Sequence, residues 1–319
     1  MTVTNAAPPA AVAVSSPVRK TRRRRTLRQR EALAAYLCLL PWLIGLLVFT
    51  AYPLVASLYY AFTDYSILSS PKWAGLQNFR QMFKDPLFFT SLRVTAEYCG
   101  VVVPGTVIIG YMMALLLNHR LPLLRLWRTI YFLPSMVPAI AGAFLWSWIF
   151  NSQYGVANGL LGDLGITGPQ WFGSETWVLP AFMIMTLWGA GSGLVLYLAA
   201  LQQVPSALYE AAQIDGAGPL RRLVHITLPM TSPVILFTVV TGIISSFQIF
   251  TAALVITKGG PNNGSLFYIL NLYNSGWVNF QEGYASALAW VLVLIMVALT
   301  LVAFLIARKT VFYNSNGGR

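Results

Sequence analysis

Charged side chains are scarce in this sequence, and their scarcity indicates its class. Asp, Glu, Lys and Arg make up 9% of the 319 residues, whereas 57% are hydrophobic. Soluble domains carry about 25% charged residues, so this chain has too few of them to cover a surface that faces water. A soluble enzyme is therefore excluded, and a protein that crosses a membrane several times is favoured.

Residues that form disulfides or bind metals are also few. The two cysteines, Cys38 and Cys99, each lie within an apolar run, and the two histidines, His119 and His225, are far apart in the sequence. These spacings match neither a disulfide framework nor a metal-ligand motif. We therefore expect no metal site in this chain.

Basic residues are concentrated directly before the first apolar run. Eight of them lie between Arg19 and Arg30. Such a tract can bind nucleic acid or anionic lipid, but arginines beside a first membrane span stay in the cytoplasm, so we interpret it as an orientation signal with additional lipid contact. No nucleic-acid partner is expected. Residues 1–31 are predicted to be a disordered, basic, cytoplasmic tail.

Six apolar segments are long enough to cross about 30 Å of hydrocarbon. Because backbone groups cannot stay unpaired in lipid, each segment must be helical, which predicts an all-α membrane protein with six transmembrane helices. The prolines inside these segments, such as Pro134 and Pro138, predict kinks or breaks. The predicted spans are about 34–62, 92–118, 128–150, 177–202, 231–257 and 284–307, within a folded domain of residues 32–308 that precedes a cytoplasmic tail, 309–319.

The charges between the spans indicate the orientation. With the N-terminus inside, 16 basic residues lie on the inner side and five on the outer side, which accounts for all 21. An excess of Lys and Arg marks the cytoplasmic side of a membrane protein. Both termini are therefore predicted to be cytoplasmic.

Ionisable residues are nearly absent from the spans themselves. Arg93 and Glu97, four residues apart in the second span, can pair on one helix face. No carboxylate or lysine lies near the middle of a span to carry a proton, no acid–base set indicates a membrane-embedded enzyme, and no phosphate-binding glycine loop is present. The chain is therefore either a passive or ion-coupled carrier, or it is driven by a partner protein.

The inner segment 203–230 interrupts the apolar pattern with two short helix signals. Ser206 is expected to cap the first helix, and Gly216 is expected to form a turn with positive φ. Pro219 suits the first turn of a second helix, which Pro229 is expected to end. On physical grounds alone, this hairpin either docks into a partner or rests on lipid.

These residues resemble the EAA loop of permeases from binding-protein-dependent ABC importers. The resemblance covers residues 34–308, nearly the whole folded chain. One departure is Leu223, because the family usually has an aromatic residue there that fills a groove of the ATPase. The residues that carry the resemblance are Glu210-Ala211-Ala212, Asp215-Gly216-Ala217 and Leu228-Pro229. Motifs similar to those of the carbohydrate branch (lactose, glycerol-phosphate and maltose permeases) are Gly75-Leu76-Gln77-Asn78-Phe79, Tyr131-Phe132-Leu133-Pro134 and Thr257-Lys258-Gly259-Gly260-Pro261.

The resemblance implies a type I ABC importer permease fold with cytoplasmic coupling helices, forming one half of a sugar pore in a bacterial cell membrane. The implied partners are a second permease subunit, two subunits that bind ATP and Mg²⁺, and an extracytoplasmic sugar-binding protein. This chain itself is then no enzyme and holds no cofactor. The implied ATPase-coupling residues are Glu210, Ala211, Ala212, Asp215, Gly216, Ala217 and Leu223.

Polar residues at helical spacing predict where a sugar binds. In the fifth span a polar residue recurs every three or four positions, at Thr238, Thr241, Ser245, Gln248 and Thr251, which predicts one stripe on a helix. Small and hydroxyl residues also mediate helix packing, and that alternative stays open. Gln248 favours ligand binding, because a buried amide needs several hydrogen-bond partners. The predicted substrate-binding residues are Ser245, Ser246, Gln248, Trp188 and Ser192.

Overall fold

The computed structural model describes residues 27–119 and 122–310, and it divides after Val55 into two units. The first unit is helical and consists of α1 (Leu27–Leu46), a π-helical stretch η1 (Leu47–Ala51) and the beginning of α2 (Tyr52–Ala61). The described side chains of this unit are almost all exposed. The predicted tails lie mostly outside the described residues.

The described ranges contain five helical segments that are long and apolar enough to cross a membrane, or six if one bent pair counts as a single span. The bent pair occupies the predicted third span, where Leu124–Met136 and Ala139–Ile149 meet at 98°. The kink or break that Pro134 and Pro138 predict within 128–150 is therefore confirmed. Pro138 lies at the bend, and proline starts a helix more readily than it continues one because it has no N–H. The five long segments are Ala34–Ala61, Pro86–Leu117, Val178–Gln202, Pro219–Ile256 and Glu282–Arg308.

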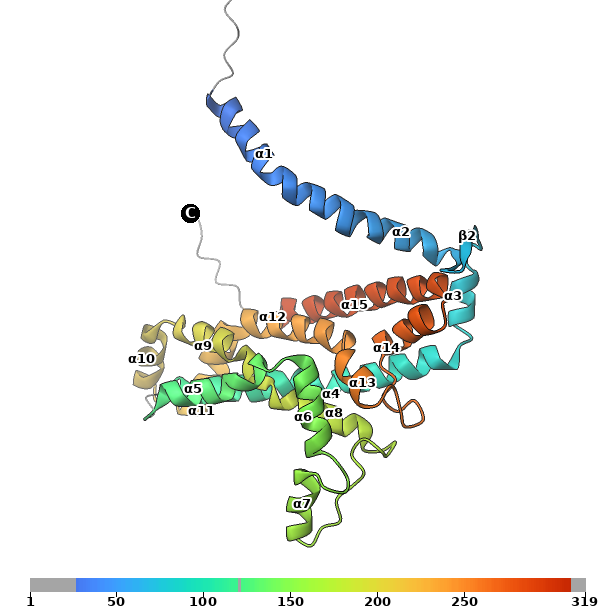
Figure 1. Ribbon diagram of the computed structural model, residues 1–319. Helices are drawn as coiled ribbons and strands as arrows, with labels where there is room; N and C mark the ends of the chain where they lie inside the picture. The colour runs from blue at the N-terminus through green and yellow to red at the C-terminus, as the bar shows by residue number, and fades with distance from the viewer. Residues whose placement is uncertain (1–26, 120–121, 311–319) are drawn as a thin grey trace, which may run out of the picture. The chain divides into compact units, whose positions relative to one another are not determined.

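The second unit contains most of the helices. Figure 1 shows α15 (Glu282–Thr310) running alongside α12 (Leu228–Phe247), and the two helices are in contact. The other helical elements, in chain order, are α3 (Gln77–Met82), α4 (Pro86–Leu117), α5 (Leu124–Phe132), η2 (Leu133–Met136), α6 (Ala139–Ile149), α7 (Val156–Asp163), α8 (Val178–Trp188), η3 (Ala190–Gly193), α9 (Leu194–Gln202), α10 (Ser206–Ile214), α11 (Pro219–Arg222), η4 (Leu223–Thr227), α13 (Thr251–Ile256), α14 (Tyr268–Tyr273) and η5 (Asn274–Val278).

Helix α4 is the centre of the hydrophobic core. Val103 on this helix packs in one buried cluster with Phe247 of α12 and Leu288 of α15. Tyr111 packs in another cluster with Tyr197 of α9. Because α4 contacts α8, α9 and α12 along its length, it holds in place the helices that form the candidate site described below.

A small sheet lies in the predicted outer segment 63–91, which the all-α prediction did not include. Strands β1 (Thr63–Ser66) and β2 (Ser69–Trp73) form an antiparallel hairpin. The side-chain amide of Asn78 in α3 donates to the carbonyl oxygens of Ala61 and Thr63, both at 2.9 Å. These bonds fasten the hairpin to α3.

The ion pair predicted in the second span is confirmed. Nε of Arg93 lies 3.7 Å from Oε1 of Glu97, and the two side chains are 72% and 56% exposed. Exposed pairs of this kind contribute little to stability. Both residues line a cavity that also contains Glu175 and is separate from the one described next.

Candidate substrate cavity and coupling loop

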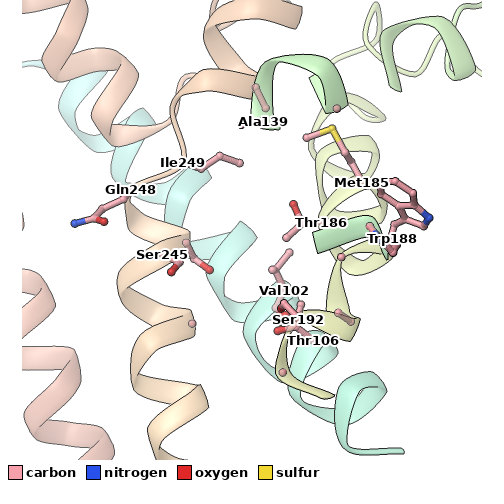
Figure 2. A pocket seen from close by; sticks show the side chains of 18 of the residues that line it. Val102, Thr106, Ala139, Met185, Thr186, Trp188, Ser192, Ser245, Gln248 and Ile249 are labelled. Atoms are coloured by element: carbon pink, nitrogen blue, oxygen red, sulfur yellow. Dashed lines mark hydrogen bonds between the residues drawn. The ribbon is translucent and has the colours of Figure 1, made fainter. Parts of the chain in front are cut away.

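Three long helical segments are interrupted beside one cavity. The third predicted span breaks at Pro138, the fourth at η3 and the fifth at residues 248–250, and residues from all three breaks line the cavity. Its volume is about 630 Å³, which is within the range of pockets that bind small organic molecules. Figure 2 shows the open space between Ser245 and Ile249 on one side and Met185 and Thr186 on the other.

Neighbouring backbones approach the break in the fourth span closely. A Cβ added at Gly191 in η3 would collide with the backbone carbonyl of Tyr131, which lies in α5. On α4, a Cβ at Gly110 would come within 2.8 Å of the carbonyl oxygen of Ala190. Glycine at these two positions lets η3 pass between α5 and α4 without a clash.

The breaks bring backbone hydrogen-bonding groups to the cavity. The first N–H groups and the last C=O groups of a helix have no partner within that helix. Helices α6 and α9 begin beside the cavity at Ala139 and Leu194, and helices α8 and α12 end beside it at Trp188 and Phe247. These helix ends therefore place both hydrogen-bond donors and acceptors beside the cavity. Substrate sites in other transporters also form where helices are broken.

The structure brings the predicted substrate residues together but changes the role of Gln248. Trp188, Ser192, Ser245, Ser246 and Gln248 all line the cavity. The predicted stripe is not one helix face, because α12 ends at Phe247 and α13 begins at Thr251.

Gln248 itself is not the buried amide that the sequence predicted. The residue is exposed, its side chain makes no hydrogen bond within the described chain, and Figure 2 shows that side chain pointing away from the cavity. The physical reason is the end of α12: Gln248 has φ −103° and ψ 12°, outside the helical range. Only its position at the rim of the cavity agrees with the prediction.

The aromatic partner of Trp188 was missed by the sequence reasoning. The indole of Trp146, in α6, lies edge-on to that of Trp188 with ring centroids 5.7 Å apart, and both residues line the cavity. The indole N–H of Trp146 is buried and has no hydrogen-bond partner in the described chain. A tryptophan in an apolar span carries no periodic signal, so only the folded chain reveals this pair.

Two hydroxyl pairs join helices in the cavity wall. The hydroxyl oxygens of Tyr98 in α4 and Thr186 in α8 are 2.6 Å apart. Tyr197 donates to the hydroxyl of Thr238 at 2.8 Å, and Thr238 in turn donates to the carbonyl of Ile235. For Thr238, a member of the predicted stripe, the structure therefore favours the packing alternative.

Charge is absent from this wall. No Asp, Glu, Lys, Arg or His is among the described residues that line the cavity. Elsewhere in the described ranges, no group of three or more His, Cys, Asp or Glu side chains is placed to hold a metal ion.

The segment 203–230 forms a hairpin that differs from the prediction at both of its ends. Pro205 precedes the first residue of α10, and no side chain caps this helix, so the prediction that Ser206 is the cap was wrong. At the turn, Gly216 has φ +72°, which confirms the predicted positive value. Helix α11 begins at Pro219, as expected.

The second helix of the hairpin does not end at Pro229. From α11 the chain continues through η4 directly into α12, so the backbone is helical from Pro219 to Phe247. The π-helical stretch lies just before Pro229, and η1 has the same place before Pro53. Such a shift of hydrogen-bond register accommodates a residue that has no N–H within a helix.

The exposure of the hairpin residues differs along its length. Leu223 is half-buried, and the most exposed large apolar side chains are instead Ile214, at 88%, and Leu220, at 73%. The hydroxyl oxygens of Tyr209 and Thr227 are 2.9 Å apart and join α10 to η4. Of the predicted coupling residues, the exposed ones are Glu210, Ala211, Asp215 and Gly216, and the half-buried ones are Ala212, Ala217 and Leu223.

The hairpin and most of the cavity lie within a region that matches a known family. Residues 106–310 match the family described as the inner membrane component of binding-protein-dependent transport systems. The chain belongs to this family. It is therefore a multi-pass membrane protein, and its relatives identify it as a permease subunit of an ABC importer.

Two relatives match most of the permease. This chain is 38% identical over 292 residues to the probable ABC transporter permease protein YesP of Bacillus subtilis (strain 168). The match covers 90% of this chain and 94% of YesP. It is 33% identical over 283 residues to the sulfoquinovosyl glycerol transport system permease protein SmoG of Agrobacterium fabrum (strain C58), which covers 87% and 91% of the two chains.

A solved structure has the same fold as the permease. It is a chain of a bacterial ABC transporter involved in the import of the acidic polysaccharide alginate. The two chains superpose with a TM-score of 0.76 and 22% sequence identity, over 88% of this chain and 96% of the other. The permease therefore has the fold of an ABC transporter membrane subunit.

Proposed function

We propose that this permease forms one half of the pore of an ATP-driven sugar importer in a bacterial cell membrane, with both termini in the cytoplasm. The observation that carries the proposal is the cavity at the three helix breaks, whose wall combines tryptophan rings with neutral hydrogen-bonding groups. A sugar presents apolar ring faces and several hydroxyl groups, which such a wall complements. Relatives named for sulfoquinovosyl glycerol, trehalose/maltose and lactose support a saccharide substrate.

Within this cavity the side chains have different roles. Trp188 and Trp146 provide aromatic surface for the sugar ring. Ser192 and Ser245 provide hydroxyl groups, whereas Ser246 is 5% exposed and supports the wall from behind. Gln248 forms part of the rim.

The hairpin of residues 203–230 is the proposed contact with the ATPase. Ile214 and Leu220 expose apolar surface that a groove in a partner would cover, and Glu210 and Asp215 are free to meet basic groups there. ATP and Mg²⁺ bind to the partner subunit. ATP shifts the transporter between its two states only through different affinities for them, and the hairpin transmits this bias to α12.

Four kinds of partner follow from this proposal. A second permease subunit completes the pore, two ATP-binding subunits supply energy, an extracytoplasmic binding protein delivers the sugar, and membrane lipid surrounds the helices. The described spans contain no midplane carboxylate or lysine that would couple transport to protons. A passive or ion-coupled carrier is the alternative, and it would transport sugar in the absence of ATP.

The test is uptake by the complete complex in liposomes, using labelled maltose, lactose and trehalose with and without ATP. Trp146→Ala is expected to lower uptake about tenfold, because the loss of an aromatic contact and of burial amounts to about 1.5 kcal/mol or more. The matched control is Trp148→Ala on the same helix, because Trp148 is 53% exposed and does not line the cavity. Equal losses in the two variants would contradict the site, and uptake without ATP would favour the carrier.

A further inference from the structure

We infer that the pore of this permease accepts neutral saccharides and rejects saccharides that carry a phosphate, sulfonate or carboxylate group. The inference rests on the proposed sugar-import function. The observation behind it is the wall of the cavity, in which the described polar side chains are the hydroxyls of Ser, Thr and Tyr, two indoles and Gln248, with no Lys, Arg or His.

Three charged residues on α4 and α5 lie outside the cavity. Arg93 pairs with Glu97, and both face the separate cavity that contains Glu175. Arg128 in α5 donates from Nη2 to the carbonyl oxygen of Leu117 at 3.2 Å, at the C-terminal end of α4, and it does not line the substrate cavity. None of these side chains lies in the cavity as the counter-charge for an anion.

The helix ends at the cavity do not replace a cation. A helix carries a partial positive charge at its N-terminus and a partial negative charge at its C-terminus. Two helices of at least eight residues, α6 and α9, begin at the cavity, and two, α8 and α12, end there. The partial charges of these helix ends therefore offset each other, and they supply no net positive charge for an anionic group.

This electrostatic environment treats neutral and anionic sugars differently. An anion that leaves water for a low-dielectric pore loses its hydration and needs a cation or a set of strong donors in exchange. A neutral sugar needs only donors and acceptors for its hydroxyl groups. The wall supplies these through the hydroxyl groups of Ser192 and Ser245 and through the broken helix ends.

Thr241 allows a cation to be introduced into the cavity with little change to the helix. This residue is exposed and lines the cavity, and its hydroxyl donates only to carbonyl oxygens of its own helix, at Phe237 and Thr238. Thr241→Lys places an ammonium group beside the substrate. Thr241→Met is the matched control, because methionine has a similar length and no charge.

The experiment uses the complete complex in liposomes and measures ATP-driven uptake of labelled saccharides in neutral and anionic pairs. The pairs are trehalose with trehalose 6-phosphate, lactose with lactobionate, and galactobiose with digalacturonate. We expect the neutral member of a transported pair to enter at least about tenfold faster. Thr241→Lys should lower its uptake about fivefold or more relative to Thr241→Met, because it strands a cation in the pore.

Uptake of an anionic member at a rate similar to its neutral partner would overturn the inference and leave sugar import intact. Faster uptake of the neutral member by Thr241→Lys than by Thr241→Met would also overturn it, because a cation in the cavity would then not hinder a neutral sugar. If ATP drives the uptake of no saccharide, the proposed function itself fails.

Discussion

Gly216 offers the sharpest test of the coupling hairpin, because it holds a backbone conformation that other residues adopt only at a cost. Its φ is +72°, and a Cβ added there would meet no atom within 4 Å. A substitution is therefore opposed by backbone strain and not by a clash. We predict that Gly216→Val weakens ATPase docking and sugar uptake while the protein still inserts into the membrane.

The size of the effect follows from the strain. A left-handed conformation costs an L-residue about 1–2 kcal/mol, and more if it is β-branched. If the hairpin must hold this turn to dock, the docking-competent fraction falls, and the apparent affinity for the ATPase falls with it by roughly 5- to 30-fold. Asparagine tolerates the left-handed region, so Gly216→Asn should retain most of the affinity.

The assay titrates ATPase subunits onto the permease heterodimer in nanodiscs, with uptake measured in parallel. Gly218→Ala is a second control, because Gly218 has φ −68° and equally open surroundings. Its docking should therefore stay close to that of the wild type. Wild-type affinity and uptake in Gly216→Val would refute the reasoning, since the turn would then have no part in docking.

Three further predictions concern the cavity, the packing and the orientation. Gln248→Leu should change uptake by less than about threefold, since the side chain points away from the cavity and loses no hydrogen bond; a tenfold loss would place this amide on the sugar. Gly191→Ala should destabilise the assembled complex by about 1–3 kcal/mol through overpacking, seen as a lower melting temperature, whereas Gly100→Ala, with open space around its Cβ, should not. The orientation can be tested in a variant that lacks Cys38 and Cys99, with an impermeant thiol reagent applied to intact cells. The reagent should label Leu164→Cys and not Leu220→Cys, because these exposed residues lie on opposite sides of the membrane in the predicted topology. The reverse labelling would contradict the orientation.

The membrane helices could be predicted from the sequence because lipid allows few alternatives. A long apolar run must be helical there, so the length and position of each run were enough to locate the long helical segments. The 98° bend between Met136 and Ala139 was not predictable in the same way. Pro134 and Pro138 indicated a break, but its angle depends on packing, including the close approach of Gly191 to the backbone of Tyr131.

The sequence predicted which residues line the candidate site, but it did not predict the direction in which their side chains point. Helical spacing placed Gln248 on a stripe because it assumed a continuous helix, and no glycine or proline lies between Phe247 and Phe250 to indicate otherwise. The ring of Phe250 packs on Tyr273 with centroids 5.1 Å apart, a contact between segments that local sequence does not encode. The pairing of Trp146 with Trp188 likewise depends on tertiary structure.

Because no loop separates η4 from α12, one continuous helix connects the hairpin to the cavity. From Pro219 to Phe247 the backbone is helical throughout, which corresponds to a length of about 40 Å at 1.5 Å per residue. An axial displacement at the hairpin reaches the helix break beside Gln248 without a flexible joint to absorb it. Inserting one residue into the α-helical part would turn one end by about 100° relative to the other. We therefore expect the outer loops of permeases of this kind to vary in length, whereas the length of this connecting helix stays the same.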